Sequence, residues 1–187
     1  NTNFEFMAEG TCGQSCGQLQ CGGTVEATSS TLIQTNVTLD YTLVQLPDNV
    51  TDTYGFLKLR NADPVFNERI YMPQHPAGRG KEIAVLSTDA NDESGFGEMN
   101  IIGVTPEGRR LGTYYIDTEG GASGSPVLGY SDNLVVVLHS AATSCDTFGN
   151  VGTITTQIIS DLGANIPDGA LLEFDLIVTT SGTGSGN

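Results

Sequence analysis

Positive charge is scarce in this sequence. Seven lysines and arginines stand against 22 acidic residues, so the 187-residue chain has a formal net charge of −15 at pH 7. All seven basic residues lie between Lys58 and Arg110. Such a surface repels phosphates and anionic headgroups, which argues against nucleic acid and against an anionic membrane as partners. The acidic excess is expected to serve solubility.

Long apolar runs and an initial methionine are also missing. No run approaches the roughly 20 apolar residues of a membrane-spanning helix. The chain begins with Asn1 and shows no signal peptide, from which we expect that processing has already taken place. Two N-glycosylation sequons, beginning at Asn36 and Asn49, fit a secreted protein. An extracellular location is therefore predicted.

Cysteine occurs at only four positions, namely Cys12, Cys16, Cys21 and Cys145. The first three are spaced closely enough to suggest a metal site, but no second Cys or His pair lies near to complete it. Disulfides in an oxidising compartment are favoured, with three pairings open and a cysteine outside the chain as a further option. The acidic run at residues 88–94 lacks the register of an EF-hand loop. No metal and no cofactor are predicted.

Short β-branched runs separated by Gly, Asn, Asp and Pro indicate an all-β protein. Residues 1–30 are expected to be loop with short strands. Strands are predicted over residues 41–47, 68–74, 81–87, 98–105 and 110–116. A hairpin is predicted from residues 125–130 and 133–142, with Ser131 and Asp132 in its turn. The last strand, residues 152–158, is expected to lead into a short helix.

The string GASGSP, residues 121–126, contains a candidate nucleophile. A serine hydroxyl becomes nucleophilic when a base removes its proton and donors stabilise the oxyanion. Glycines permit a sharp turn whose amides converge on one point. Ser123 is therefore the candidate nucleophile, with the N–H groups of Gly121 and Ser123 as the oxyanion hole. A short G-x-S-G string also occurs in ordinary Gly/Ser loops, whereas the longer string over residues 117–128 is far more specific.

The sequence resembles the trypsin/chymotrypsin-like serine endopeptidases, most closely the secreted microbial lysyl and glutamyl endopeptidases. Their nucleophile motif matches residues 121–126, and the strand entry that carries their triad aspartate matches residues 38–47. Residues 71–85 resemble the segment that opens the second barrel, and residues 135–152 resemble the strand and loop of the specificity pocket. The resemblance implies a chymotrypsin-like double β-barrel with a short C-terminal helix, in which Asp40 is the triad aspartate.

The family's catalytic histidine precedes the aspartate in a motif like T-A-x-H-C, and no histidine precedes Asp40 here. A histidine on a separate N-terminal chain of the same precursor is favoured, because half a barrel would expose strand edges; a disarmed or truncated homologue is the alternative. Residues 1–66 would then be the C-terminal part of the first barrel, 67–175 the second barrel and 176–187 a flexible tail. In lysyl-type relatives the cysteine matching Cys145 bonds the N-terminal segment, so an interchain disulfide is expected there.

Neither histidine of the chain is expected to be the base. His75 precedes a proline in a turn and resembles a non-catalytic turn histidine. His139 lies on an apolar strand. It is either a buried, hydrogen-bonded core residue or a wall of the specificity pocket, as in the glutamyl branch, and both interpretations remain open.

Specificity for Lys or Arg is predicted from acidic residues near the pocket. An acid at the base of a dry pocket selects a basic side chain through a charge-assisted pair. Asp146 resembles the aspartate with which lysyl endopeptidases read lysine, and Asp117 precedes Ser123 at the offset seen in trypsin. The absence of tryptophan departs from the lysyl type, whose pocket wall includes one.

Two alternatives accompany this prediction. Glutamyl specificity would use His139 and Thr118. A non-catalytic protein on a protease fold would use the same strands to hold a peptide. In each case Ser140 and Ala141 are expected to pair their backbone with the bound peptide as an added strand.

Overall fold

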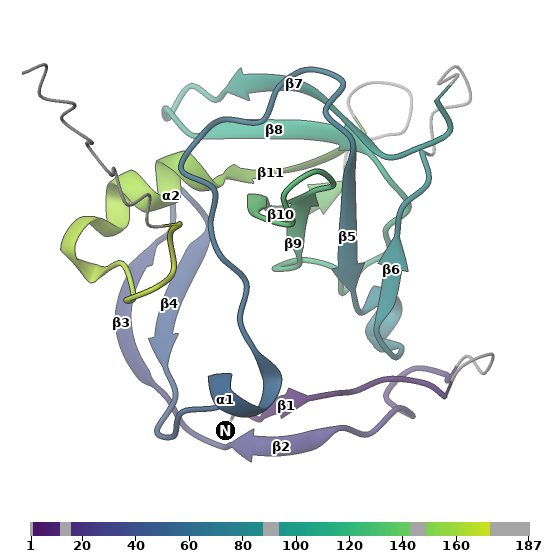
Figure 1. Cartoon of the computed structure of the whole chain (residues 1–187), viewed down its shortest axis with the longest axis vertical. Helices are drawn as coiled ribbons and strands as arrows, with labels where there is room; N and C mark the ends of the chain where they lie inside the picture. The colour runs from purple at the N-terminus through teal and green to yellow at the C-terminus, as the bar shows by residue number, and fades with distance from the viewer. Residues whose placement is uncertain (1, 12–15, 88–93, 143–148, 173–187) are drawn as a thin grey trace, which may run out of the picture.

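The computed structural model describes residues 2–11, 16–87, 94–142 and 149–172 (Figure 1). It is built mainly of β-strands, which confirms the predicted all-β, chymotrypsin-like class. The strands are β1 (Phe4–Phe6), β2 (Thr24–Ala27), β3 (Thr31–Asn36), β4 (Tyr41–Gln45), β5 (Ile70–Gln74), β6 (Glu82–Ala84), β7 (Glu98–Val104), β8 (Arg110–Tyr115), β9 (Pro126–Gly129), β10 (Val135–Ala142) and β11 (Asn150–Ile154). The helices are α1 (Thr51–Tyr54) and α2 (Thr155–Leu162), with 3-10 turns η1 (Pro76–Gly78) and η2 (Gly163–Asn165).

The second half of the chain forms a curled, seven-stranded antiparallel sheet with the order β6-β5-β9-β10-β11-β8-β7. Main-chain hydrogen bonds also join the start of β5 to the start of β7, from Ile70 N–H to Gly97 O and from Met99 N–H to Glu68 O. These bonds close the sheet into a barrel between β5 and β7. The barrel interior is filled by Ile70, Met72, Met99, Tyr114, Ile116, Ala122, Val127, Val136, Val137 and Ile154.

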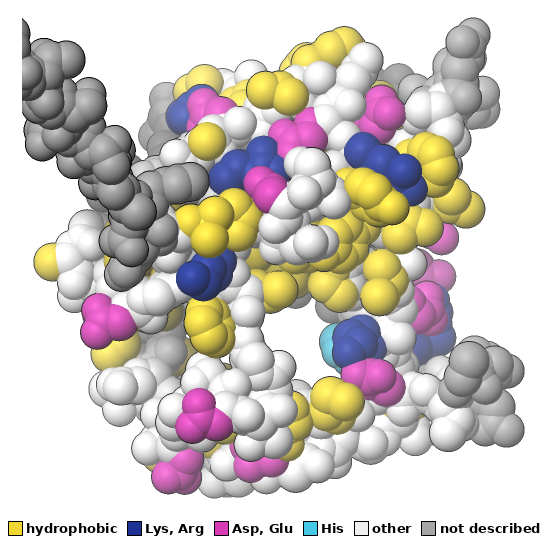
Figure 2. Space-filling view, in the orientation of Figure 1, with side chains coloured by type: hydrophobic (Ala, Val, Ile, Leu, Met, Phe, Trp, Pro, Cys, Tyr) yellow, Lys and Arg dark blue, Asp and Glu magenta, His cyan; other side chains and the backbone are white. Residues whose placement is uncertain are grey.

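The first half is more open. It holds two separate two-stranded sheets, β1–β2 and β3–β4, and the described residues form no closed barrel there. A small apolar cluster joins Leu39 and Tyr41 to the inner face of α2. Figure 2 shows the molecule hollowed in its middle, with hydrophobic side chains around the hollow. Large apolar side chains such as Leu32 and Phe56, each 60% exposed, remain uncovered in this half.

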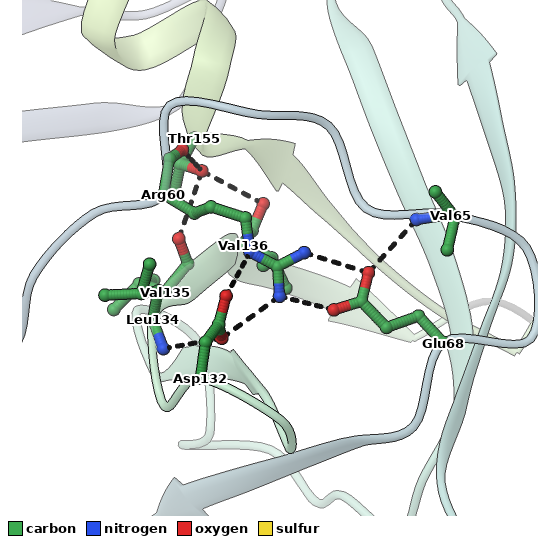
Figure 3. Close-up of polar contacts among 8 residues, drawn as sticks. All are labelled: Arg60, Val65, Glu68, Asp132, Leu134, Val135, Val136 and Thr155. Atoms are coloured by element: carbon green, nitrogen blue, oxygen red, sulfur yellow. Dashed lines mark hydrogen bonds and ion pairs between the residues drawn. The ribbon is translucent and has the colours of Figure 1, made fainter. Parts of the chain in front are cut away.

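Arg60 fastens the segment between the two halves to the seven-stranded sheet (Figure 3). Its guanidinium forms two hydrogen bonds with Glu68 and an ion pair of 2.9 Å with Asp132. Its carbonyl accepts a hydrogen bond of 3.0 Å from the hydroxyl of Thr155 at the start of α2. Burial lowers the pKa of Arg60, but the two carboxylates outweigh burial and hold that pKa above its ordinary value. The network keeps an irregular segment in one position on the barrel.

In the described part of the chain, no helix combines the length and the apolar character needed to cross a membrane. The strand predictions hold to within a few residues, except at the end of the last strand. That strand stops at Ile154, and α2 already begins at Thr155. The hydroxyl of Thr155 bonds the carbonyl oxygens of Arg60 and Val135, which fixes this residue at a helix start rather than in a sheet.

Candidate active site

Ser123 lies exposed in the turn that connects β8 to β9. Ala122, just before it, is fully buried in the barrel. The N–H of Gly124, just after it, donates to the carbonyl of His139 at 2.8 Å. The Ser123 hydroxyl donates to the carbonyl of Ser140 at 3.1 Å. The turn is therefore anchored on both sides of the serine, while the hydroxyl itself remains accessible at β10.

The amides of this turn divide into bonded and free groups. The N–H of Ala122 donates to Glu119 O at 3.0 Å, and the N–H of Ser125 donates to Ala122 O at 3.0 Å. Among the residues that the structure describes, the N–H groups of Gly121 and Ser123 have no hydrogen-bond partner. These are the two amides predicted as oxyanion donors. They are thus available to a ligand oxygen.

The turn rests against η1. Gly121 has a φ of +101°, a region that favours glycine. A Cβ at this position would lie 3.2 Å from the carbonyl oxygen of His75 and 3.3 Å from the N–H nitrogen of Gly78. The N–H of Ala77 donates to Gly120 O at 2.8 Å. Both the backbone angle and the close approach of η1 therefore call for glycine at position 121.

The loop that the Cys16–Cys21 disulfide closes packs against η1. The two cysteines have Cα atoms 5.6 Å apart. Within the loop, the N–H of Leu19 donates to Gly78 O at 2.9 Å. A Cβ on Gly80 would fall within 3 Å of both sulfur atoms. The N-terminal loop thus lies directly behind the segment that supports Gly121.

A hollow of about 360 Å³ opens beside Ser123. It is lined by Pro73, Gln74, His75, Lys81, Gly121, Ser123, Gly124, Ser125 and Pro126. On its rim, Lys81 forms an ion pair with Glu9. Its lining combines the nucleophile turn with residues next to η1 and does not include the predicted substrate-binding residues 139–141.

The two histidines are engaged elsewhere. His75 is exposed, and its Nδ1 lies 3.0 Å from the carbonyl oxygen of Arg79. His139 is 4% exposed, and its Nδ1 lies 2.6 Å from the hydroxyl of Tyr114. Burial lowers the pKa of His139 and raises that of Tyr114. Within the described structure neither histidine bonds to Ser123 or to Asp40.

Asp117 and Thr118 stand at the start of the turn. The carbonyl of Asp117 accepts a hydrogen bond of 2.7 Å from the buried amide of Gln74, while its side chain lies at an exposed position. The Thr118 hydroxyl donates to the side-chain oxygen of Asn150 at 2.7 Å, and Asn150 donates to the carbonyl of Ile116 at 2.5 Å. Asn150 was not predicted from the sequence, yet it ties the entry of the turn to β11.

Asp40 occupies the β3–β4 turn with a left-handed φ of 57°. Its carboxylate, 59% exposed, lies 3.5 Å from a terminal nitrogen of Arg109. The same guanidinium donates to the hydroxyl of Ser140 at 2.9 Å and to that of Thr153 at 2.7 Å. The structure therefore brings Asp40 and Ser140 together through Arg109. Sequence reasoning missed Arg109, because its position relative to Asp40 depends on how the two halves meet.

The remaining predicted residues are placed as follows. Ala141 is exposed on β10, and Asn49 is exposed before α1. The side chain of Asn36 donates to Asp161 at 3.0 Å. Asp146, Cys12 and Cys145 lie outside the described residues. Among the described residues no group of three or more His, Cys, Asp or Glu side chains is placed to hold a metal ion.

Known proteins resemble this chain in sequence. Residues 2–137 match the family model of the trypsin-like peptidase domain. Secreted RxLR effector protein 73 of Plasmopara viticola is 44% identical over 164 residues, which are 87% of this chain and 39% of that protein. The chain thus spans about two fifths of that relative's length.

Two plant-virus proteases are similar in structure. For the tobacco vein mottling virus protease the TM-score is 0.37 at 16% identity, covering 59% of this chain and 45% of that one. For the catalytically active tobacco etch virus protease complexed with product the TM-score is 0.40 at 20% identity, covering 65% and 48%.

Proposed function

The chain belongs to the family of trypsin-like peptidase domains, and from this premise we propose that it is the nucleophile-bearing part of a serine endopeptidase. Ser123 attacks the scissile carbonyl while a histidine takes its proton; the C–N bond then breaks, the amine leaves with that proton, and water hydrolyses the resulting acyl-enzyme. The N–H groups of Gly121 and Ser123 stabilise the oxyanion. The observation that carries this proposal is the pattern of bonded and free amides around an exposed serine hydroxyl.

The base in this proposal is a histidine from outside these 187 residues, on the N-terminal chain of the same precursor. Asp40 orients that histidine, and a disulfide at Cys145 links the two chains. The engagement of His139 with Tyr114, and of His75 with Arg79, supports an external base. The uncovered apolar side chains of the first half support a chain that packs against it.

The substrate class in this proposal is a peptide with Lys or Arg before the scissile bond, read by Asp146 with Asp117 nearby. The strong negative charge of the chain favours the approach of cationic peptides. Glutamyl specificity is less well supported. It would use His139 with Thr118, and burial lowers the pKa of His139, which disfavours a charged imidazole as the partner of a substrate carboxylate.

The setting in this proposal is extracellular. The curated relative is described as a secreted effector, and two sequons are present at Asn36 and Asn49. That relative is named as an effector and not as a peptidase, which also favours a second candidate function. In this second candidate, a protease-fold protein binds a peptide without cleaving it. The two candidates differ in whether Ser123 is activated.

A fluorophosphonate probe separates the two candidates, because it modifies only an activated serine. The matured two-chain assembly should be labelled stoichiometrically at Ser123, and its Ser123→Ala variant should not be labelled. Ser131→Ala, in the exposed β9–β10 turn, is the matched control and should be labelled like the wild type. An inert wild type would overturn the endopeptidase proposal in favour of the binding protein. Peptides with Lys, Arg or Glu before the scissile bond then report the specificity.

A further inference from the structure

We propose that Arg109 is a positioning residue of this site, which holds the carboxylate of Asp40 beside the Ser140 end of β10. The inference rests on the proposed function, in which Asp40 orients the catalytic histidine. It adds a residue from the β7–β8 turn to a site whose predicted residues lie on the β3–β4 turn, the β8–β9 turn and β10.

Arg109 is itself held firmly. Its N–H donates to the hydroxyl of Thr105 at 3.2 Å, and its carbonyl accepts from the N–H of Thr105 at 2.9 Å. Its guanidinium donates to Thr153 at 2.7 Å and to Ser140 at 2.9 Å. The side chain is 17% exposed. Two neighbouring strands, β10 and β11, therefore fix the direction of the guanidinium independently of Asp40.

The β3–β4 turn meets this anchor at two adjacent points. The hydroxyl of Thr153, which accepts from Arg109, donates to the carbonyl of Leu39 at 2.7 Å. Asp40 follows Leu39, and its carboxylate lies 3.5 Å from Arg109. Among the described residues no other side chain pairs with this carboxylate. Without Arg109, a carboxylate that is 59% exposed would turn freely into solvent.

Arginine suits this task for a geometric reason. Its planar guanidinium carries five donors in a fixed fork, so it serves Thr153, Ser140 and Asp40 together. A carboxylate offers two oxygens and about four acceptor sites. The contact with Arg109 engages one oxygen of Asp40 and leaves the other for the N–H of a histidine. Arg109 can therefore hold the carboxylate of Asp40 while that carboxylate orients the histidine.

The experiment uses the matured two-chain assembly and compares Arg109→Met with wild type in peptide hydrolysis and in fluorophosphonate labelling. We expect kcat to fall about threefold to fivefold, because a pair at 3.5 Å with an exposed carboxylate is weak. KM should change less than about twofold, since Arg109 acts on Asp40 rather than on the substrate. Arg109→Lys should recover part of kcat, because it keeps the charge without the fork.

Two comparisons distinguish an action of Arg109 through Asp40 from a purely structural role of Arg109. One uses the Asp40→Asn background and the other uses a matched control. If Arg109 acts through Asp40, Arg109→Met should cost less than about twofold in that background. Arg110→Met, which breaks the neighbouring pair with Asp63, should leave kcat unchanged. An unchanged kcat in Arg109→Met, or an equal loss in both backgrounds, overturns the role of Arg109 alone. An inert wild type overturns the proposed function itself.

Discussion

Replacing Arg60 by methionine should lower the free energy of unfolding by about 3 kcal/mol. The side chain of Arg60 is 14% exposed, and that of its partner Glu68 is 12% exposed. Breaking a buried pair by removing one partner costs about 3–5 kcal/mol, because the remaining charge stays buried. The second partner, Asp132, is 34% exposed and is partly solvated after the change, so the lower end applies. Methionine retains most of the apolar stem, which isolates the loss of charge.

The measurement is urea-induced and thermal unfolding of the purified protein at neutral pH. For a chain of this length, about 3 kcal/mol corresponds to a fall in melting temperature of roughly 6–12 °C. The matched control is Arg79→Met, whose partners Glu82 and Glu119 are about half exposed. An exposed pair of this kind contributes about 0–1 kcal/mol. The two arginines therefore differ mainly in burial.

A comparison within the same network sharpens the test. Adding Glu68→Gln to Arg60→Met should cause no further loss and should recover part of the stability, because it removes the charge left uncompensated. If Arg60→Met costs no more than Arg79→Met, or if the second substitution destabilises additively, the reasoning from burial is refuted. The segment between the two halves would then be held by its main-chain bonds alone.

Two further predictions concern the turn and a buried histidine. Gly121→Ala should slow fluorophosphonate labelling at least about fivefold, because a φ of +101° costs another residue about 1–3 kcal/mol. Gly120→Ala, where a Cβ meets nothing within 4 Å, should react normally, and equal rates would contradict the argument. Burial lowers the pKa of His139 below its ordinary 6.5, so the unfolded chain takes up this proton more readily and stability falls as pH drops below 6.5. His139→Gln should flatten that slope in urea unfolding between about pH 7 and 5, and an unchanged slope would exclude His139 as its cause.

The sequence predicted both strands whose burial alternates, such as β5, and strands that carry a continuous buried run, such as β9 and β10. β4 begins at Tyr41, directly after Asp40 as expected, and β9 and β10 form the predicted hairpin. β3 was missed because Thr31, Leu32 and Ile33 are all exposed. β3 is a strand because its backbone pairs with β4. Backbone pairing of this kind leaves no apolar pattern in the residues of β3 themselves.

The same distinction applies to the candidate site. The nucleophile turn could be located from its glycines, because backbone angles at Gly121 and Gly124 are local properties. The contact between Arg109 and Asp40 joins residues 69 positions apart and depends on the packing of the β3–β4 turn against β11. No local pattern records such a contact. The same holds for Asn150, which supports Thr118 across two strands.

The packing behind Gly121 has a consequence for any attempt to shorten the protein. The oxyanion turn rests on η1, and η1 rests on the loop closed by Cys16 and Cys21, about 100 residues earlier in the chain. The three segments therefore pack in series, and each supports the next. A minimal fragment that kept only the residues from 67 onward would retain Ser123 and the barrel core. It would also lose the loop closed by Cys16 and Cys21. The face of η1 that this loop covers would then be exposed to water, and η1 would support the nucleophile turn less firmly.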